Sequence, residues 1–340
     1  MRKQSTWIKI SLLVLILVAA GTFITLPYYV STPGSAQELK PFVKVEGGDE
    51  DDGELMLVTI SMGKANVFRY LSTFMNKYHH LYTEEEVLGK GGSHQEYSFR
   101  QSHMMKTSQN AAMEVAYTKA GKKVEYVHNG ALVFHVMEDM PASDKLQLGD
   151  YIKKVDEKEM KTAQAFIDYV GQKKAGDTVT ITYEREGKED TVVLTLQTLK
   201  DDPKRAGIGV SIGDDRTLQV DPAIKIDAKE IGGPSAGLMF TLEIYNQLVP
   251  EDITKGHRIA GTGTINDKGE VGPIGGADQK VLAAEEAGAT VFFAPAMKID
   301  GKSNYDEAVA AAKDTGAKIE VVPVHTLDDA LNYLAGLQAK

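Results

Sequence analysis

The pattern of apolar and polar residues predicts a strand at ELMLVTISM (residues 54–62), followed by a mainly helical region. This helical region covers residues 65–119 and is interrupted around GKGGS (89–93). Its second half, SHMMKTSQNAAMEVAYTKAG, has helical periodicity and ends at Gly121, a residue type that is common at helix ends. We therefore expect one strand and several helices at the start of the folded part.

From about residue 124 the pattern changes from helices to short strands. GALVFHVM and DYIKKVDEKEM predict strands, and TAQAFIDYVGQKK predicts a short helix. GDTVTITYEREGKEDTVVLTLQ (176–197) predicts two alternating strands joined by a turn at REGKED. These segments together predict a compact module that is rich in strands.

After KDDPKR (200–205) the chain alternates between strand and helix patterns. The strand patterns are LQVDPAIKID, TVFFAP and KIEVVPV, and the helix patterns are SAGLMFTLEIYNQLV, QKVLAAEEAGA, YDEAVAAAKDTG and LDDALNYLAGL. This succession predicts a layered α/β domain.

The N-terminal residues predict a membrane anchor. Residues 10–26 carry no charge, and the longer stretch 10–30 has about the length needed to cross a bilayer. Three basic residues precede this stretch and the next is Lys40, which predicts a cytoplasmic N-terminus with the rest of the chain outside. A signal peptide cleaved near VAA (18–20) is the alternative interpretation.

Composition and charge narrow the classes of function. The chain has 340 residues, enough for two domains with extensions, and a net charge of −10 without any basic block that would indicate nucleic-acid binding. It has no cysteine, which excludes disulfides, cysteine nucleophiles and thiolate metal sites. No motif predicts a cofactor, a metal ion or an ATPase. The candidate chemistry therefore lies in other side chains.

GGPSAG (232–237) contains the first candidate, Ser235, which is flanked by glycines and followed at once by an apolar, helix-like run. Serine is favoured at helix N-caps, so one interpretation is purely structural. The other is that Ser235 is a nucleophile, because glycines allow close approach of a substrate and the free N–H groups of the following helix would stabilise an oxyanion. Spacing alone leaves both interpretations open.

A serine nucleophile needs a base that accepts its proton. Lys280 follows a glycine-rich turn and begins a helix of mainly Val, Leu and Ala, a placement that would lower its pKa through burial. His257 and His325 lie in the same part of the chain, so a Ser–His–Asp triad assembled in space is the alternative.

GGPSAG, followed 45 residues after its serine by the lysine of GPIGGADQKVLAA, resembles the catalytic core of the Lon proteases. The resemblance spans at least residues 207–340 and implies a Ser–Lys dyad, with Ser235 as nucleophile and Lys280 as general base. It further implies that Thr262 hydrogen-bonds the lysine. The acidic residue that this family usually has three positions before the serine is Gly232 here, so any help from an acid is absent or supplied elsewhere.

The strand-rich module resembles a PDZ domain, most specifically in LQLGDYIKKVD (146–156). PDZ domains bind extended peptides by strand addition and commonly capture a C-terminal carboxylate. SHMMKTSQNAAMEVAY and ELMLVTISM resemble a helix and the opening strand of the Lon protease domain, so the PDZ unit is expected to be inserted in that domain. Essentially the whole chain resembles the PDZ-containing, membrane-anchored Lon-like serine proteases of Gram-positive bacteria (YlbL-type).

The implied fold is an α/β (α+β) Lon-type protease domain with an inserted PDZ-like β module and one N-terminal transmembrane helix. The expected organisation is a cytoplasmic N-terminus (1–9), a transmembrane anchor (10–30), a linker (31–54), the N-terminal part of the Lon-like protease domain (55–120), the PDZ domain (121–200) and the Lon-like proteolytic core (201–340).

The implied function is a single-pass, membrane-anchored, ATP-independent serine endopeptidase whose catalytic domain is extracytoplasmic. Its partners would be the membrane and short or unfolded peptides or proteins recruited by the PDZ domain, with homo-oligomers expected because Lon-type domains often form rings. No cofactor, metal or nucleic acid is expected. The alternative is a non-catalytic, membrane-anchored PDZ adaptor that binds peptides.

Overall fold

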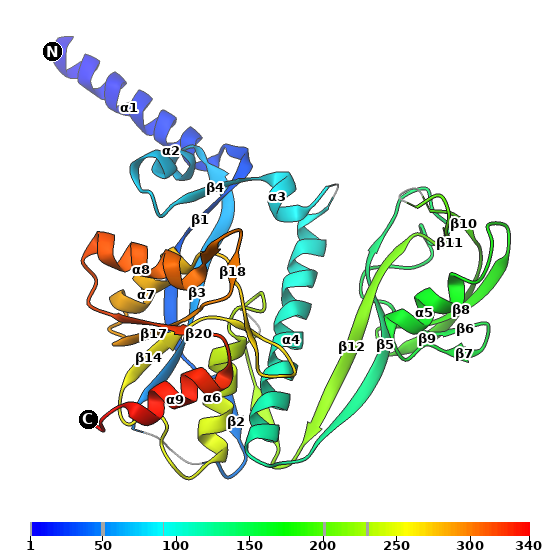
Figure 1. Cartoon of the computed structure of the whole chain (residues 1–340). Coiled ribbons are helices and arrows are strands. Elements are labelled where there is room, and N and C mark those ends of the chain that lie inside the picture. The colour runs from blue at the N-terminus through cyan, green and yellow to red at the C-terminus, as the bar shows by residue number, and fades with distance from the viewer. Residues whose placement is uncertain (1, 49–51, 91, 200–201, 229–230) are drawn as a thin grey trace.

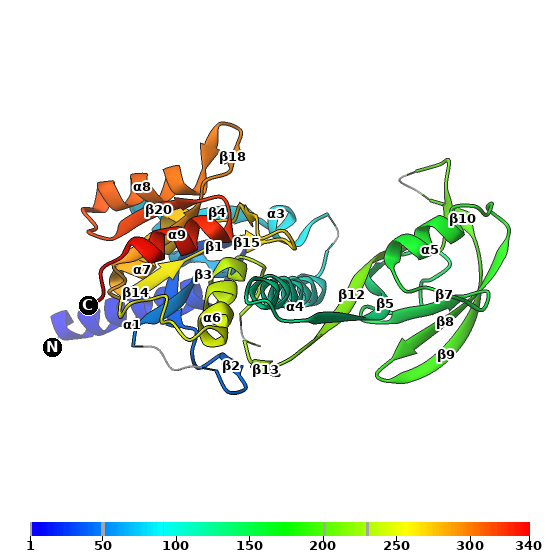
Figure 2. The same cartoon turned by 60° about the horizontal axis from the view of Figure 1, so that its bottom comes forward.

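The computed structural model describes residues 2–48, 52–90, 92–199, 202–228 and 231–340. It shows a main body, built on one sheet covered by helices, and a strand-rich module beside it (Figure 1, Figure 2). A long helix, α1 (Arg2–Phe23), projects from the body at the N-terminal end.

Within the described residues, the sheet of the main body has six strands in the order β20-β17-β14-β3-β1-β4. The first four in this order are parallel, and β1 and β4 pair antiparallel at the other side. In chain order the strands are β1 (Thr25–Glu38), β3 (Glu54–Asn66), β4 (His80–Thr83), β14 (Arg258–Gly261), β17 (Val291–Pro295) and β20 (Glu320–Val324).

Alternation along β3 divides the core into two layers. Leu55 and Leu57 are buried with α4, α6 and α9, whereas Met56 and Val58 are buried with α7 and α8 on the opposite face. The helices are α4 (His94–Lys119), α6 (Gly237–Leu248), α7 (Ala277–Glu286), α8 (Asn304–Thr315) and α9 (Leu327–Gly336). The predicted strand at 54–62 and the layered α/β arrangement are thus confirmed.

The module has its own sheet, in the order β12-β5-β6-β8-β9, and its own apolar core. Its elements are β5 (Val124–Val136), β6 (Tyr151–Val155), β7 (Lys158–Glu159), α5 (Ala163–Val170), β8 (Thr178–Arg185), β9 (Lys188–Thr195) and β12 (Val210–Val220). β12 pairs with β5 along its whole length, so the sheet continues beyond the boundary predicted at residue 200.

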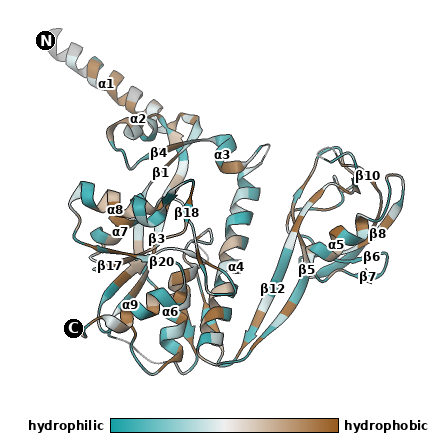
Figure 3. Ribbon diagram, in the orientation of Figure 1, coloured by the Kyte–Doolittle hydropathy of each residue, from teal (hydrophilic) through white to brown (hydrophobic). Residues whose placement is uncertain are grey.

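The N-terminal prediction needs a correction. The expected anchor (10–30) and linker (31–54) overlap strand β1, which pairs with β3 inside the sheet and buries Tyr29 and Val30. The last apolar residues of the run 10–30 are therefore part of the protein core. Among the described residues, no helix has the length and apolarity that crossing a membrane requires. Figure 3 shows apolar residues along α1.

The region predicted as mainly helical contains two further short helices, with β4 between them. They are α2 (Val67–Met75) and α3 (Glu84–Leu88). The remaining short strands pair as β2 (Val43–Val45) with β13 (Ile224–Ile226), β10 (Gln197–Thr198) with β11 (Ala206–Gly207), β15 (Thr264–Ile265) with β16 (Val271–Gly272), and β18 (Lys298–Ile299) with β19 (Lys302–Ser303).

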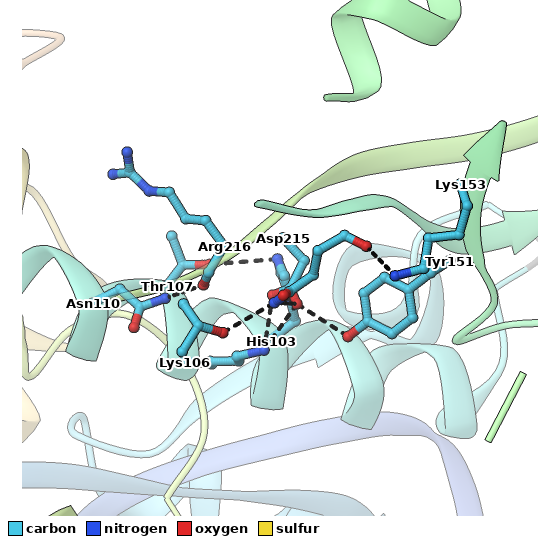
Figure 4. Close-up of polar contacts among 10 residues, drawn as sticks. His103, Lys106, Thr107, Asn110, Tyr151, Lys153, Asp215 and Arg216 are labelled. Carbon is cyan, nitrogen blue, oxygen red and sulfur yellow. Dashed lines mark hydrogen bonds and ion pairs between the residues drawn. The ribbon is translucent and has the colours of Figure 1, made fainter. Parts of the chain in front are cut away.

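Asp215 of β12 joins the module to helix α4 (Figure 4). Both of its carboxylate oxygens accept hydrogen bonds from Lys106 of α4 at 2.9 Å. The same carboxylate accepts from Asn129 Nδ2 at 2.8 Å and from the Tyr151 hydroxyl at 3.0 Å, both within the module. Asp215 is 2% exposed, so this is a buried polar cluster between the two bodies.

Candidate active site

Ser235 lies in the loop that leads into α6, and helix α4 holds this loop in place. The backbone N–H of Gly233, a residue with a φ of +84°, donates to the carbonyl oxygen of Gln101 at 3.0 Å. The Ser108 hydroxyl donates to the carbonyl oxygen of Pro234 at 3.0 Å. The sequence analysis identified neither of these α4 residues. Ser108 is a buried polar residue on an otherwise apolar helix face, and such a polar residue indicates a hydrogen-bonding role.

The side chain of Ser235 does not cap the helix. The N-cap of α6 is Ala236, and it makes no side-chain capping bond. The Oγ atom of Ser235 instead lies 2.7 Å from Nζ of Lys280. The purely structural interpretation of this serine is therefore wrong.

Lys280 sits in α7 and is 2% exposed. Its amine also lies 3.0 Å from Oγ1 of Thr262, a fully buried residue. Burial lowers the pKa of Lys280 from 10.5 to about 7, because a charged amine is poorly solvated there. No carboxylate pairs with this amine among the residues that the structure describes.

Thr262 links the two partners of the pair. Its hydroxyl donates to the backbone carbonyl of Ser235 at 3.0 Å and can therefore accept from the Lys280 amine. The N–H of Gly263 donates to the same Ser235 carbonyl at 2.8 Å. These bonds fix the position of both Ser235 and Lys280, in the arrangement that the sequence resemblance implied for Thr262.

The two histidines considered as alternative bases lie elsewhere. Nε2 of His257 is within 2.8 Å of the carbonyl oxygen of Gln338, and the backbone of His325 donates to Asp329 at the start of α9. Over the part of the chain that the structure describes, no histidine lines the cleft beside Ser235. A Ser–His–Asp triad at Ser235 is therefore wrong.

Ser235 and Lys280 form part of the wall of a cleft of about 920 Å³. Residues 57–60 and 62 of β3 and residues 231–236 line it, together with side chains from the first half of α4. Gly232 also lies here, where an added Cβ atom would come within 3.1 Å of Gln101 Cβ. A bulkier residue at this position would press against α4, which is consistent with glycine in place of the expected acid.

One edge of β3 is open along this cleft. β14 pairs with β3 only at residues 54–57, while β1 pairs with the other edge up to Asn66. Among the described residues no strand pairs with residues 58–62 on the β14 side. Unpaired backbone groups of a strand edge can bind an extended peptide by strand addition.

Thr262→Val is expected to reduce kcat/KM for peptide cleavage by about 10–100-fold, because it removes a hydrogen bond to the reacting amine. Thr262→Ser keeps the hydroxyl and should retain most of the activity. Steady-state cleavage of one peptide by both variants measures the difference. Equal activity of Thr262→Val and the parent protein would show that this hydrogen bond is dispensable.

The lowered pKa of Lys280 also predicts how stability changes with pH. Between about pH 7 and 10.5 the unfolded chain binds a proton at Lys280 that the folded chain does not, so stability should rise with pH in this window. The rise is at most about 1.4 kcal/mol per pH unit. Urea unfolding across this range measures it, and Lys280→Met should show a smaller rise. The same slope in both proteins would contradict a neutral buried lysine.

Two family models match parts of this chain. Residues 219–335 match the family model of the Lon protease (S16) C-terminal proteolytic domain, and residues 113–196 match that of the PDZ domain. The Lon protease of Mycoplasma mobile is 43% identical over 63 residues, which are 18% of this chain and 7% of that protein. The matched stretch is thus a small part of that relative's length.

Solved structures of PDZ domains are also similar to part of this chain. The PDZ domain of the SdrC-like protein from Listeria monocytogenes is 37% identical and covers 25% of this chain and 90% of its own, with a TM-score of 0.24. The PDZ domain of the SdrC-like protein from Listeria innocua is 38% identical and covers 25% of this chain and 93% of its own, with a TM-score of 0.23. By the two family models, the chain is a mixed α/β protein that carries a PDZ domain and a serine protease proteolytic domain of the Lon (S16) type.

Proposed function

We propose that the protein is a serine endopeptidase that uses Ser235 as nucleophile and Lys280 as general base. The observation that carries the proposal is the 2.7 Å distance between Oγ and Nζ, with the amine buried and its pKa lowered to about 7. A buried amine of this kind is populated in its neutral form near neutral pH and can accept a proton.

In the proposed reaction, the Ser235 hydroxyl gives its proton to the Lys280 amine while Oγ attacks the carbonyl carbon of the scissile peptide bond. The lysine ammonium then protonates the leaving nitrogen, and the C–N bond breaks to leave an ester on Oγ. Water adds to this ester while Lys280 takes a proton from it, and the lysine ammonium then returns that proton to Oγ as the C–Oγ bond breaks. The product leaves as a carboxylic acid, which loses its proton to the solvent. Lys280 ends the cycle neutral.

The oxyanion formed in each half-reaction would be stabilised at the start of α6. Within the described residues, the backbone N–H groups of Ser235 and Ala236 have no hydrogen-bond acceptor, and they precede the first turn of that helix. Free N–H groups at a helix N-terminus favour negative charge. Because the scaffold already positions them, no reorganisation is needed when the charge develops.

The substrate would be an extended peptide. The open edge of β3 at residues 58–62 supports this, since an added strand there would pass beside Ser235. The PDZ domain would bind a second segment of the same chain and so raise the effective concentration of the scissile bond. The proposal further includes attachment to a membrane through α1, an extracytoplasmic catalytic domain and cleavage without ATP; the uncharged run 10–26 supports the attachment.

This proposal predicts that the full chain cleaves an unfolded protein and leaves its folded form intact, without added ATP. Mass spectrometry of the products from casein, and from one protein before and after unfolding, measures this. Ser235→Ala is the control, because it removes only the nucleophile. Peptide binding with no cleavage by the parent protein would favour the adaptor instead, and cleavage that persists in Ser235→Ala would refute the assignment.

A further inference from the structure

Helix α2 (Val67–Met75) carries its apolar side chains on the outside. It has no buried residue, and the exposed fractions are 45% for Phe68, 50% for Leu71, 72% for Phe74 and 88% for Met75. A surface helix in water normally turns its apolar face to the core. The orientation of α2 is therefore inverted with respect to that of a helix on a water-soluble protein.

The polar side of α2 faces the protein and fixes this orientation. Nη2 of Arg69 donates to the carbonyl oxygen of Val30 in β1 at 3.1 Å, and Oγ of Ser72 lies 2.8 Å from Nδ1 of His79. Asn66 caps the helix by accepting from the backbone N–H of Arg69 at 2.9 Å. Rotating α2 to bury its apolar face would break its bonds to Val30 and His79, so the outward apolar face is built into the fold.

The apolar face of α2 continues onto α1. Residues 12–16 of α1 are consecutive exposed apolar side chains, so that helix is apolar all round over this stretch, and Phe23 at its end is 83% exposed. The two helices touch, because a Cβ atom added at Gly21 would lie 3.0 Å from the Phe68 ring. Figure 3 shows α2 at the base of α1, where α1 leaves the body.

We propose that α2 lies in the interface of a lipid bilayer, with Phe68, Leu71, Phe74 and Met75 in contact with the acyl chains beside the end of α1. Arg69 is the only charged residue of α2, and it is turned toward the protein. A second copy of the chain could cover α2 but would leave the all-round apolar surface of α1 in water. A bilayer covers both helices at once. The proposal depends on the membrane attachment included in the proposed function, but not on the Ser235–Lys280 chemistry.

Two contacts with the bilayer would fix how the catalytic body faces it. One residue separates α1 from β1, and α2 directly follows β3. Because both helices would contact the bilayer, the ends of β1 and β3 next to them would lie close to the membrane surface. Met62, at one end of the cleft, precedes α2 by five residues, or roughly 17 Å along the strand. The cleft would thus be placed to receive peptides that are attached to, or emerge from, the same membrane.

Single cysteines test the position of α2, because the natural chain has none. The full chain carrying Leu71→Cys is labelled with a polarity-sensitive fluorophore and reconstituted in phosphatidylcholine–phosphatidylglycerol vesicles. Val14→Cys reports α1, and Val193→Cys, an exposed apolar position on β9 with 65% exposure, is the matched control far from α2. We expect lipids with nitroxide groups to quench the labels at 14 and 71 but not the label at 193.

The results at positions 14 and 71 distinguish attachment through α1 from contact of α2 with the bilayer. If lipid quenches the label at 14 but the label at 71 is exposed to water, the proposal for α2 is overturned, whereas membrane attachment through α1 is retained. A water-exposed label at both positions overturns the membrane attachment as well. Protection of the label at 71 from lipid and aqueous quenchers alike, increasing with protein concentration, overturns the proposal in favour of a second copy of the chain.

Phe74→Glu is a second variant that should fold normally, because the side chain is 72% exposed. It should abolish lipid quenching at position 71, lower cleavage of a lipid-linked peptide several-fold, and leave cleavage of soluble casein unchanged. An equal effect of Phe74→Glu on both substrates would contradict the proposal for α2. If the parent protein itself does not cleave casein, the result would instead contradict the proposed peptidase function.

Discussion

Lys280→Ala is expected to reduce kcat for cleavage of an unfolded protein by about 10²–10⁴-fold, the usual contribution of a general base. The amine at 2.7 Å from Ser235 Oγ is the one base within reach of this hydroxyl among the described residues. Without it, the serine would have to lose its proton to water. Initial rates of fragment release from a labelled unfolded protein measure the effect.

Lys280→Arg is the matched control for charge and size. Arginine does not lose its proton in proteins, so a residue that acts only by its positive charge would tolerate the change, whereas a base would not. We expect Lys280→Arg to be as inactive as Lys280→Ala. Retained activity in Lys280→Arg would contradict the assignment of a base and favour an electrostatic role.

The pH profile gives an independent test of the same role. Because the pKa of Lys280 is lowered to about 7, kcat/KM of the parent protein should increase as pH rises through 7 and level off above it. The direction follows from the sign of the charge: the protonated amine, dominant at lower pH, cannot accept the serine proton. A profile that falls over this range would exclude a lysine base with this pKa.

The dyad could be predicted from the sequence because each partner lies in a distinctive local stretch. Ser235 is enclosed by glycines, and Lys280 stands in a helix whose other residues are mainly apolar, so its burial follows from composition. The roles of Gln101 and Ser108 could not be predicted, because α4 precedes the serine loop by more than 100 residues and no local pattern records that contact. Such contacts depend on tertiary packing.

The predicted end of the N-terminal anchor at residue 30 was wrong because it, too, depends on tertiary packing. The residues of β1 follow α1 almost without a break, and a window of apolar residues does not distinguish a bilayer from a partner strand. The pairing of β1 with β3 places these residues in the sheet, and the partner residues lie about 30 positions away in the sequence. Pro33 and Gly34 resembled linker residues, but they lie where the β1–β3 register shifts, a position that tolerates both.

The sequence did not reveal that the sheet of the module extends beyond residue 200, because β12 pairs with β5, a strand that lies far away in sequence. β12 contains Gly213 and the charged residues Asp214, Asp215 and Arg216, which weaken the strand pattern. The register between β12 and β5 shifts between Asp215 and Arg216. The carboxylate of Asp215 lies between the module and α4. Aspartate is unfavourable in strands, but here it has a structural role.

Asp215→Ala is expected to destabilise the junction between the PDZ module and α4 by about 3–5 kcal/mol, the usual cost of removing one partner from a buried charged cluster. The change leaves the Tyr151 hydroxyl and the Asn129 amide without this acceptor, and leaves Lys106 without its ion-pair partner. Urea unfolding measures the loss, and hydrogen exchange should show faster exchange in β12 and α4.

Asp215→Asn and Lys123→Ala are the matched controls. Asn keeps the shape and one acceptor oxygen, so its cost should be smaller than that of alanine. Lys123 pairs with Glu125 at an exposed position of the same module, with side chains 88% and 64% exposed, and its replacement should change stability by less than about 0.5 kcal/mol. A similar small change for Asp215→Ala would show that the buried cluster does not hold the module.

The pKa of Asp215 defines when this junction should fail. Burial alone would raise the pKa of the carboxyl, but hydrogen bonds from Lys106, Asn129 and Tyr151 outweigh it, and the pKa lies below 3.8. The stabilisation is therefore present above about pH 4 and is lost as pH falls through the folded-state pKa.

Because α4 also holds the serine loop through Gln101 and Ser108, loosening its outer face in Asp215→Ala should lower peptide cleavage together with stability. Measuring both quantities in one protein distinguishes a junction that positions the active site from one that only joins two domains. If cleavage by Asp215→Ala is unchanged while β12 exchanges faster, α4 keeps the serine loop in place without help from the PDZ module.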